Sequence, residues 1–354
     1  METKKWVTRF IAGALLIIGI VSGINLIVNP YNVFGHGLDG FAPRKEYVLS
    51  DRMSKFYIAN RLEPKTIMMG TSRIGLFAES QLAPYLEGPV YNASMAGSTI
   101  DEQAAYIRYM VGQGYVKNVV WSLDFFSFNP TKPIDPAFEA QRLSDAPYLN
   151  DYLISLFSFK TLNRSFMTLQ TNLLRQNKDQ NLTLAQIQHN IQYTLKEYAR
   201  ERTFLCSEEF KKPSSINQKL KTLQSTIAYC NAKGVSVSLY TSPIFYRHID
   251  MIYGLGLGDT FEYWKKGLAG IQPYTDFCTY SALSKEPMKF RDSSHVSSEV
   301  GELVFTRLFA DRHAVPDDFG ILLTPATVES HLARQRQYRQ HFSMTGPLSG
   351  TGKD

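Results

Sequence analysis

The chain has 354 residues, of which 44% are hydrophobic and 20% are charged, and its formal net charge is +6. This composition excludes an intrinsically disordered or collagen-like chain, and a chain of this length can bury a core without a disulfide or metal scaffold. Its three cysteines, Cys206, Cys230 and Cys278, form no CxxC pair. We therefore expect no metal, and no cofactor is predicted.

The positive charge is concentrated at the two ends of the chain. Met1–Arg9 and Ala326–Asp354 each carry a net charge of +2, which leaves only +2 for the residues between them. Nucleic-acid binding depends on basic residues gathered on one face, and the sequence shows no such cluster. We therefore expect no nucleic-acid partner.

Residues 10–28 form an uncharged apolar run of 19 residues that follows a basic segment containing Lys4, Lys5 and Arg9. About 20 helical residues span the hydrocarbon of a bilayer, and flanking positive charges stay on the cytoplasmic side. The run therefore predicts a single-pass anchor in the cell inner membrane, with residues 1–9 cytoplasmic and the main domain periplasmic. The alternatives are a cleaved signal peptide and a buried helix of a soluble protein.

After the anchor, residues 29–64 are predicted to form a connector and a helix, and then apolar β-type runs alternate with helical patterns. The predicted strands are Thr66–Met69, Val90–Asn92, Asn118–Leu123 and Val235–Tyr240, and the predicted helices are Leu76–Leu86, Ile100–Val111, Ile216–Ala232 and Glu299–Phe309. Apolar strands that alternate with helices are typical of a doubly wound parallel sheet. We therefore predict an α/β domain over residues 65–323.

Two segments depart from this alternation. Residues 130–213 show helical periodicity with little strand character, and we interpret them as a helical insertion that either shapes a substrate cleft or only covers the sheet. Residues 324–354 are polar and rich in Arg and Gln, so they are predicted to form a partly disordered tail.

Ser72 follows the first predicted strand of the domain, in the sequence MGTSR. Ligands of open α/β sheets bind at the carboxyl ends of the strands, so a hydroxyl at this position would face a substrate. The alternative is a structural turn or helix cap. The adjacent Arg73 could bind an anionic substrate or make a surface ion pair.

Asp292 and His295 form a second motif near the end of the domain, in the sequence RDSSHVS. A carboxylate three residues before a histidine can reach its Nδ1, fix the tautomer and leave Nε2 free to take a proton from a serine. The alternative is that Asp292 caps the next helix and His295 has no role. The other histidines show no metal-ligand spacing such as HxxxH.

Ser72, the turn Asn92–Gly97 and the pair Asp292 and His295 together resemble the SGNH (GDSL-type) hydrolase superfamily, over roughly residues 65–309 without the insertion. The resemblance implies a flavodoxin-like doubly wound parallel sheet carrying a Ser-His-Asp triad. In that triad Ser72 is the nucleophile, His295 the base and Asp292 the acid. The resemblance also implies oxyanion donors at the backbone of Ser72 and at Gly97.

The third sequence block of that superfamily is altered here. The superfamily usually has Gly-x-Asn-Asp after its third strand, with the asparagine donating to the oxyanion, whereas this chain has LDFFSFN over residues 123–129. Such a donor contributes about 3 kcal/mol to transition-state stabilisation. Asn129 or Ser127 could replace it, backbone donors could act alone, or the protein could be catalytically weak. Asp124 cannot donate while it is ionised.

The resemblance implies a periplasmic serine esterase or O-acyltransferase acting on acyl esters of cell-envelope polysaccharide. Anchored members with an altered third block are similar to the auxiliary proteins of alginate O-acetylation and teichoic-acid D-alanylation, which implies a multi-span membrane acyltransferase as a partner. The rival interpretation is a catalytically inactive protein of the same fold that binds glycan or acts as a scaffold in a synthesis complex.

Overall fold

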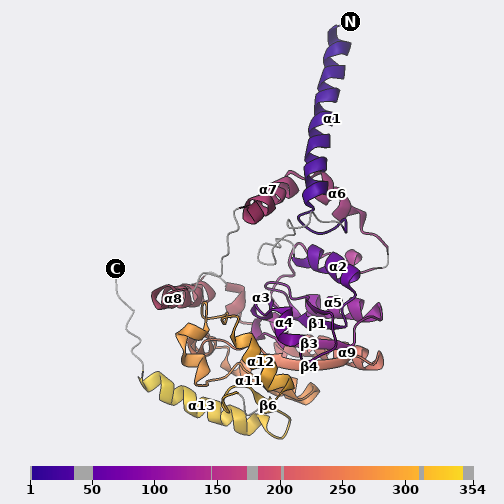
Figure 1. Cartoon of the computed structure of the whole chain (residues 1–354). Helices are drawn as coiled ribbons and strands as arrows, with labels where there is room; N and C mark the ends of the chain where they lie inside the picture. Colours follow the sequence, from indigo (N-terminus) through magenta and orange to yellow (C-terminus); the bar gives the residue numbers. More distant parts are fainter. Residues whose placement is uncertain are drawn as a thin grey trace, which may run out of the picture. The chain divides into compact units, whose positions relative to one another are not determined.

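The structure is a computed structural model that describes residues 2–35, 51–144, 146–173, 182–200, 203–310 and 315–345 (Figure 1). It divides into two compact units. The first contains the described residues of 1–63 and 135–181, and the second contains those of 64–134 and 182–354.

The first unit is helical. Its helices are α1 (Glu2–Val28), α2 (Asp51–Leu62), α6 (Leu149–Phe157) and α7 (Phe159–Leu173). The segment Thr3–Val28 of α1 is long and apolar enough to cross a membrane, and only 17% of its most apolar window is buried. That low burial disagrees with a core helix of a soluble protein, so α1 is suited to act as a single-pass anchor.

The C-terminal end of α1 packs against α6 and α7. Asn25 is completely buried there, and its Nδ2 donates to the carbonyl oxygens of Leu156 at 2.9 Å and Ser158 at 3.2 Å. The hydroxyl of Ser165 in turn donates to Oδ1 of Asn25 at 3.0 Å. Because these bonds satisfy a buried amide, they fix the end of α1 within this unit.

The predicted insertion 130–213 is therefore not one element. Its helices α6 and α7 belong to the first unit, whereas α8 (Leu184–Arg200) belongs to the second. In the predicted connector and helix, residues 29–64, residues 36–50 lie outside the described residues. The helix α2 follows them near the end of this segment.

The second unit is built on a six-stranded sheet with the order β2-β1-β3-β4-β5-β6. The strands are β1 (Thr66–Met69), β2 (Val90–Asn92), β3 (Asn118–Leu123), β4 (Ser236–Thr241), β5 (Tyr274–Asp276) and β6 (Ile321–Leu323). The strands β1 to β5 are parallel, and β6 runs antiparallel to β5. The predicted α/β sheet is thus confirmed, and the order 2-1-3-4-5 of its parallel strands is that of flavodoxin-like sheets.

Helices cover this sheet on both faces. The helices of this unit are α3 (Ser72–Gly75), α4 (Glu79–Leu82), α5 (Ile100–Gly112), α8, α9 (Asn217–Ala232), α10 (Tyr246–Gly254), α11 (Gly258–Ile271), α12 (Val300–Phe309) and α13 (Val328–Thr345). Right-handed crossovers place α5, α9 and α11 on one face and α4 on the other. The contacts agree, because α9 packs against α5 and α11, whereas α4 packs against α12.

The predicted helix Leu76–Leu86 is wrong, since α3 and α4 replace it with two short helices. Ala78 between them is extended, with ψ of 143°. The Nδ2 of Asn92 donates to the carbonyl oxygens of Ile74 at 2.9 Å and Phe77 at 3.0 Å. Because the side chain of Asn92, at the end of β2, supplies hydrogen bonds to these two carbonyl groups, they do not require the N–H groups of a continuous helix.

The polar segment that follows β6 contains α13, a helix that was not predicted. Val328, His331, Leu332 and Gln335 are buried at the spacing of one helix face. Residues 346–354, the end of the predicted tail, lie outside the described residues.

Candidate active site

The strand order reverses between β1 and β3, and the candidate site lies at the carboxyl ends of these two strands. From β1 the chain crosses to β2 on one side and then to β3 on the other, which is the switch point where open α/β sheets bind ligands. Ser72 follows β1, and Asp124 follows β3.

A tight turn at Gly70 places Ser72 at this edge. A Cβ on Gly70 would approach the carbonyl oxygen of Ser122 in β3 to 2.8 Å, so only glycine fits. Thr71 then caps α3, and Ser72 is the first residue of that helix. The hydroxyl of Ser72 is partly exposed rather than committed to the cap, which Thr71 provides.

Ser72 and His295 are hydrogen-bonded although they are 223 positions apart in the chain: Oγ of Ser72 lies 2.8 Å from Nε2 of His295. On the other side of the ring, Nδ1 lies 2.9 Å from Oδ2 and 3.1 Å from Oδ1 of Asp292. The three predicted residues therefore lie in the order of a Ser-His-Asp triad.

The protonation of Asp292 sets the tautomer of His295. Burial alone would raise the pKa of Asp292, but the hydrogen bond and charge of His295 and the backbone N–H groups of Ser294 and His295 outweigh it, so the pKa lies below its usual value. An ionised carboxylate only accepts hydrogen bonds, so Nδ1 of the neutral ring must donate. Nε2 is then the acceptor and faces the Ser72 hydroxyl.

The loop that carries the acid and base is held from several sides. The backbone N–H groups of Ser294 and His295 donate to Oδ1 of Asp292 at 2.7 and 3.0 Å. The hydroxyl of Ser293 is hydrogen-bonded to Nδ1 of His248 in α10, at 3.1 Å. These contacts fix the His295 ring before any substrate binds, which is what general-base catalysis requires.

Arg73 is buried, not a surface residue. It is 8% exposed, and its Nη1 donates to Oδ1 of Asp124 at 2.7 Å, while Nε donates to the hydroxyl of Ser294 at 3.1 Å. Asp124 also accepts from the hydroxyl of Thr71. The surface ion pair considered for Arg73 is therefore wrong, because the side chain ties the ends of β1 and β3 to the loop of Asp292 and His295. Arg73 also lines the cavity, and its contact with an anionic substrate stays a prediction.

Gly97 lies beside Ser72 in the cavity wall. The turn that carries it is bonded to the end of β1, because the N–H of Met95 donates to the carbonyl oxygen of Gly70 at 2.9 Å. Gly97 has φ of +61°, and no atom lies within 4 Å of the point that a Cβ would occupy. Among the described residues, no acceptor is found for the backbone N–H groups of Ser72 and Gly97, and both residues line the cavity.

The side chains of Asn129 and Ser127, which were expected to donate to the oxyanion in place of the altered third block, are engaged elsewhere. Asn129 is completely buried, does not line the cavity, and its Oδ1 accepts from the N–H and hydroxyl of Thr131, both at 2.9 Å. Ser127 lines the cavity, but its hydroxyl donates to the carbonyl oxygen of Ser98 at 2.9 Å. Of the oxyanion donors considered from the sequence, only the backbone N–H groups remain.

The triad opens into a cavity of about 280 Å³. One wall is α8, which contributes Thr194, Glu197 and Tyr198, and Lys132 lines the cavity as well. Part of the predicted insertion therefore shapes this cleft. Sequence reasoning missed these residues, although Thr194, Glu197 and Tyr198 lie three and four positions apart, which places them on one helix face beside the apolar stripe of Ile187 and Ile191.

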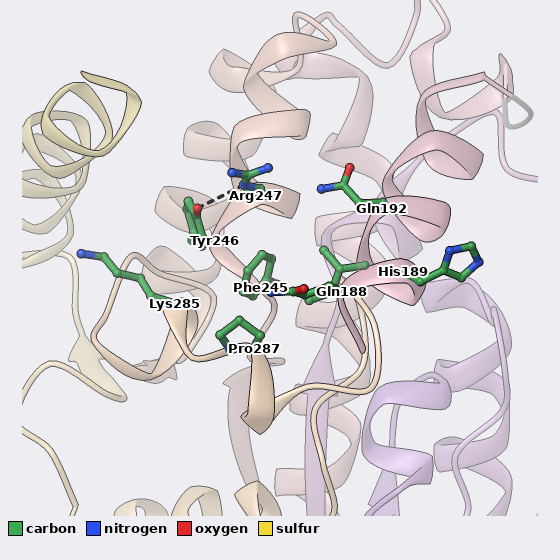
Figure 2. A pocket seen from close by; sticks show the side chains of 9 residues that line it. Gln188, His189, Gln192, Phe245, Tyr246, Arg247, Lys285 and Pro287 are labelled. Atoms are coloured by element: carbon green, nitrogen blue, oxygen red, sulfur yellow. Dashed lines mark hydrogen bonds between the residues drawn. The ribbon is translucent and has the colours of Figure 1, made fainter. Parts of the chain in front are cut away.

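A second hollow of about 490 Å³ is formed by the preceding turns of α8 with the start of α10 and a loop at Lys285 and Pro287. Figure 2 shows Phe245 beside Gln188, whereas the ring of His189 points away from them. Nε of Arg247 donates to the hydroxyl of Tyr246 at 3.1 Å. The residues lining this hollow include no serine, cysteine or carboxylate, so it holds no such nucleophile.

Over the described residues, no group of His, Cys, Asp and Glu is arranged to hold a metal ion. A scan against protein-family models gives no match, and a search of the curated proteins gives none either.

Proposed function

We propose that the second unit is a serine hydrolase or acyltransferase domain of the SGNH type that acts on acyl esters through Ser72, His295 and Asp292. The observation that carries this proposal is the hydrogen bond of 2.8 Å between Oγ of Ser72 and Nε2 of His295, with Asp292 on Nδ1. A bond of this kind activates a hydroxyl that is otherwise a weak nucleophile.

The reaction has two halves. As Oγ of Ser72 attacks the ester carbonyl carbon, its proton passes to Nε2, and the carbonyl oxygen becomes an oxyanion facing the N–H groups of Ser72 and Gly97. The bond to the leaving alcohol then breaks, and Nε2 returns the proton to that alcohol. Water or a sugar hydroxyl next attacks the acyl-serine and gives its proton to Nε2, and the departing Ser72 oxygen takes it back.

The cavity favours a short acyl group on a polar molecule. At about 280 Å³ it is slightly smaller than the usual range of ligand pockets, about 300–1,000 Å³. Lys132, Thr194, Glu197 and Tyr198 give it polar walls suited to hydroxyl groups. These features support an acetyl-sized ester of a carbohydrate over a long-chain lipid ester.

The setting supports an envelope polysaccharide as the substrate. A chain anchored through α1 acts close to a membrane surface, and the resemblance to auxiliary proteins of polysaccharide acylation adds a multi-span membrane acyltransferase as the proposed partner. In the proposed topology the main domain is periplasmic, because the basic residues that precede the apolar run stay in the cytoplasm.

A second candidate is a catalytically inactive glycan-binding or scaffold protein of the same fold. The observation in its favour is that the end of β3 carries Asp124, paired with Arg73, where a side-chain amide donor would be expected. Loss of one oxyanion donor lowers kcat about 10²–10³-fold, so weak activity alone does not separate the two candidates.

The test uses the full-length protein in detergent and an O-acetylated sugar, and measures acetate release with and without a sugar acceptor. We expect release that is lost in Ser72→Ala and kept in Ser144→Ala, a matched change at an exposed serine of the first unit. Acetyl transfer to the acceptor would identify a transferase. Equal background release by the native protein and Ser72→Ala would favour the inactive candidate.

A further inference from the structure

The helices α6 and α7 are amphipathic in the opposite sense to helices on the surface of a soluble protein. Their large apolar side chains are exposed, with Leu149 66%, Phe157 49%, Phe159 69% and Phe166 53% accessible, and Leu153 is exposed as well. A surface helix in water normally turns such residues toward the core.

The buried faces of the same two helices are polar. Asp151, Ser155, Thr161 and Ser165 are all at most 1% exposed. Asp151 accepts from Nη2 of Arg142 at 2.8 Å, so even its charge is paired inside the unit. These partners satisfy the buried polar groups and fix the orientation of the helices, with their apolar faces outward.

This outward apolar face adjoins the end of α1. α6 and α7 pack against α1, where Asn25 is bonded to Leu156 of α6 and Ser165 of α7, and Val21 and Val28 of the same turns are buried as well. Leu26 and Ile27 of the same turns stay exposed. The apolar surface of α1 therefore continues onto the two helices within the first unit, as their place at the base of α1 indicates (Figure 1).

The depth of α1 in a bilayer decides what covers that surface. From Val21 to Val28 the helix rises about 11 Å, at about 1.5 Å per residue. Half of a hydrocarbon layer is about 15 Å thick. If the apolar run fills the layer, the turns that α6 and α7 contact lie in the leaflet at the C-terminal end of α1.

We propose that α6 and α7 form an interfacial platform whose exposed apolar face is immersed in that leaflet, at the boundary of head groups and acyl chains. An amphipathic helix lying in the plane of the membrane has this pattern of exposed aromatic and aliphatic residues. The exposed Lys160, next to Phe159, suits anionic lipid head groups. The platform is thus a second membrane contact, independent of the catalytic proposal.

Spin labels at residues 153, 157 and 166 of the full-length protein in vesicles of phosphatidylethanolamine and phosphatidylglycerol test this proposal. Each is introduced as a cysteine in a Cys206→Ser background, because Cys230 and Cys278 are buried. Leu16→Cys in α1 is the lipid control, and Met288→Cys, an exposed apolar position in the second unit, is the aqueous control.

The measured quantity is the collision rate of each label with oxygen divided by its collision rate with a water-soluble nickel chelate. We expect a ratio at residues 153, 157 and 166 that lies above the ratio at Met288 and below the ratio at Leu16, as is typical of a label at the membrane interface. A ratio equal to that at Met288 would overturn the proposal, and so would exclusion of both reagents, which would mean that a second copy covers the face. A ratio at Leu16 as low as that at Met288 would also overturn the proposal, because it would mean that α1 does not span the bilayer.

A measurement on the native chain keeps the proposal testable if the cysteine variants do not fold. Phospholipids carrying a photoactivatable group on the acyl chain are mixed into the same vesicles, and the adducts are located by peptide mass spectrometry. Adducts on peptides from α6 or α7 as well as α1 are expected, whereas adducts on α1 alone would contradict the platform.

Discussion

Arg73 and Asp124 form a buried ion pair that joins the carboxyl ends of β1 and β3 directly beside the candidate nucleophile, with 2.7 Å between Nη1 and Oδ1. Because Nε of Arg73 also donates to Ser294, the same side chain links this pair to the loop that holds His295. The pair positions the triad without being one of its members.

Breaking this pair from one side is expected to destabilise the fold. Asp124→Leu leaves a buried guanidinium without its carboxylate, which costs about 3–5 kcal/mol. The double variant Arg73→Met with Asp124→Leu removes both charges and should recover most of that loss. Urea unfolding of the full-length protein in detergent measures the free energy of unfolding of both variants. An equal loss in the single and double variants would contradict the expectation that the unpaired charge causes the loss.

Asp292→Asn is expected to lower kcat by about 10⁴-fold, the effect of turning the acid of such a triad into an amide. The amide carbonyl can still accept the backbone N–H groups of Ser294 and His295, so the loop should stay folded. The amide cannot enforce the Nδ1–H tautomer, however. Rates of ester hydrolysis together with the thermal unfolding midpoint separate these effects, and an unchanged rate would speak against the assigned role.

Gly97→Ala keeps the backbone N–H but disfavours the φ of +61° at that residue, so it tests the proposed oxyanion donor by changing the orientation of the N–H. Its positive φ makes a Cβ cost about 1–2 kcal/mol, although there is room for the atom. Gly234→Ala is the matched control, since Gly234 also has a positive φ and open space but lies after α9, outside the cavity. We expect similar losses of stability in both variants and a fall in kcat only in Gly97→Ala. Equal kcat values would argue against a donor at Gly97.

The acid stability of the second unit should depend on Asp276. Burial would raise its pKa, but Lys265 and His331 outweigh that effect and lower the pKa from 3.8 to about 2. A lowered folded-state pKa means that the stabilisation is complete above about pH 4 and disappears as the pH falls through 2. The shift corresponds to about 2 kcal/mol.

Unfolding free energies measured between pH 2 and pH 5 check this expectation. The double variant Lys265→Met with Asp276→Asn removes the pair without leaving a buried charge, and its free energy of unfolding should vary less over that range. The same slope in the native protein and the double variant would show that other carboxyl groups dominate.

The sequence allowed the strands around the site to be predicted, because buried parallel strands form short apolar runs. Three of them begin and end as predicted, and the fourth, β4, is shifted by one residue. The strands β5 and β6 are only three residues long each, too short for a pattern to stand out. α13 was missed because its buried face includes His331 and Gln335, which weaken the apolar periodicity.

At the site, Asp292 and His295 could be identified because they interact over one turn of chain. The approach of Ser72 to His295 followed only from the family resemblance. The pairing of Asp124 with Arg73 does not follow from a local pattern, because the two residues are 51 positions apart. A charged residue that ends a buried strand needs a partner, and Arg73 at the end of the adjacent strand meets that need.

The most direct test of the proposed triad asks which atom of the native protein reacts with an electrophile. Full-length protein in detergent is treated with a fluorophosphonate, and the modified residue is located by peptide mass spectrometry. The triad predicts a single adduct on Ser72 that forms much more slowly in His295→Gln. An unmodified Ser72 in folded protein, or an adduct on another serine that is indifferent to His295→Gln, would contradict it.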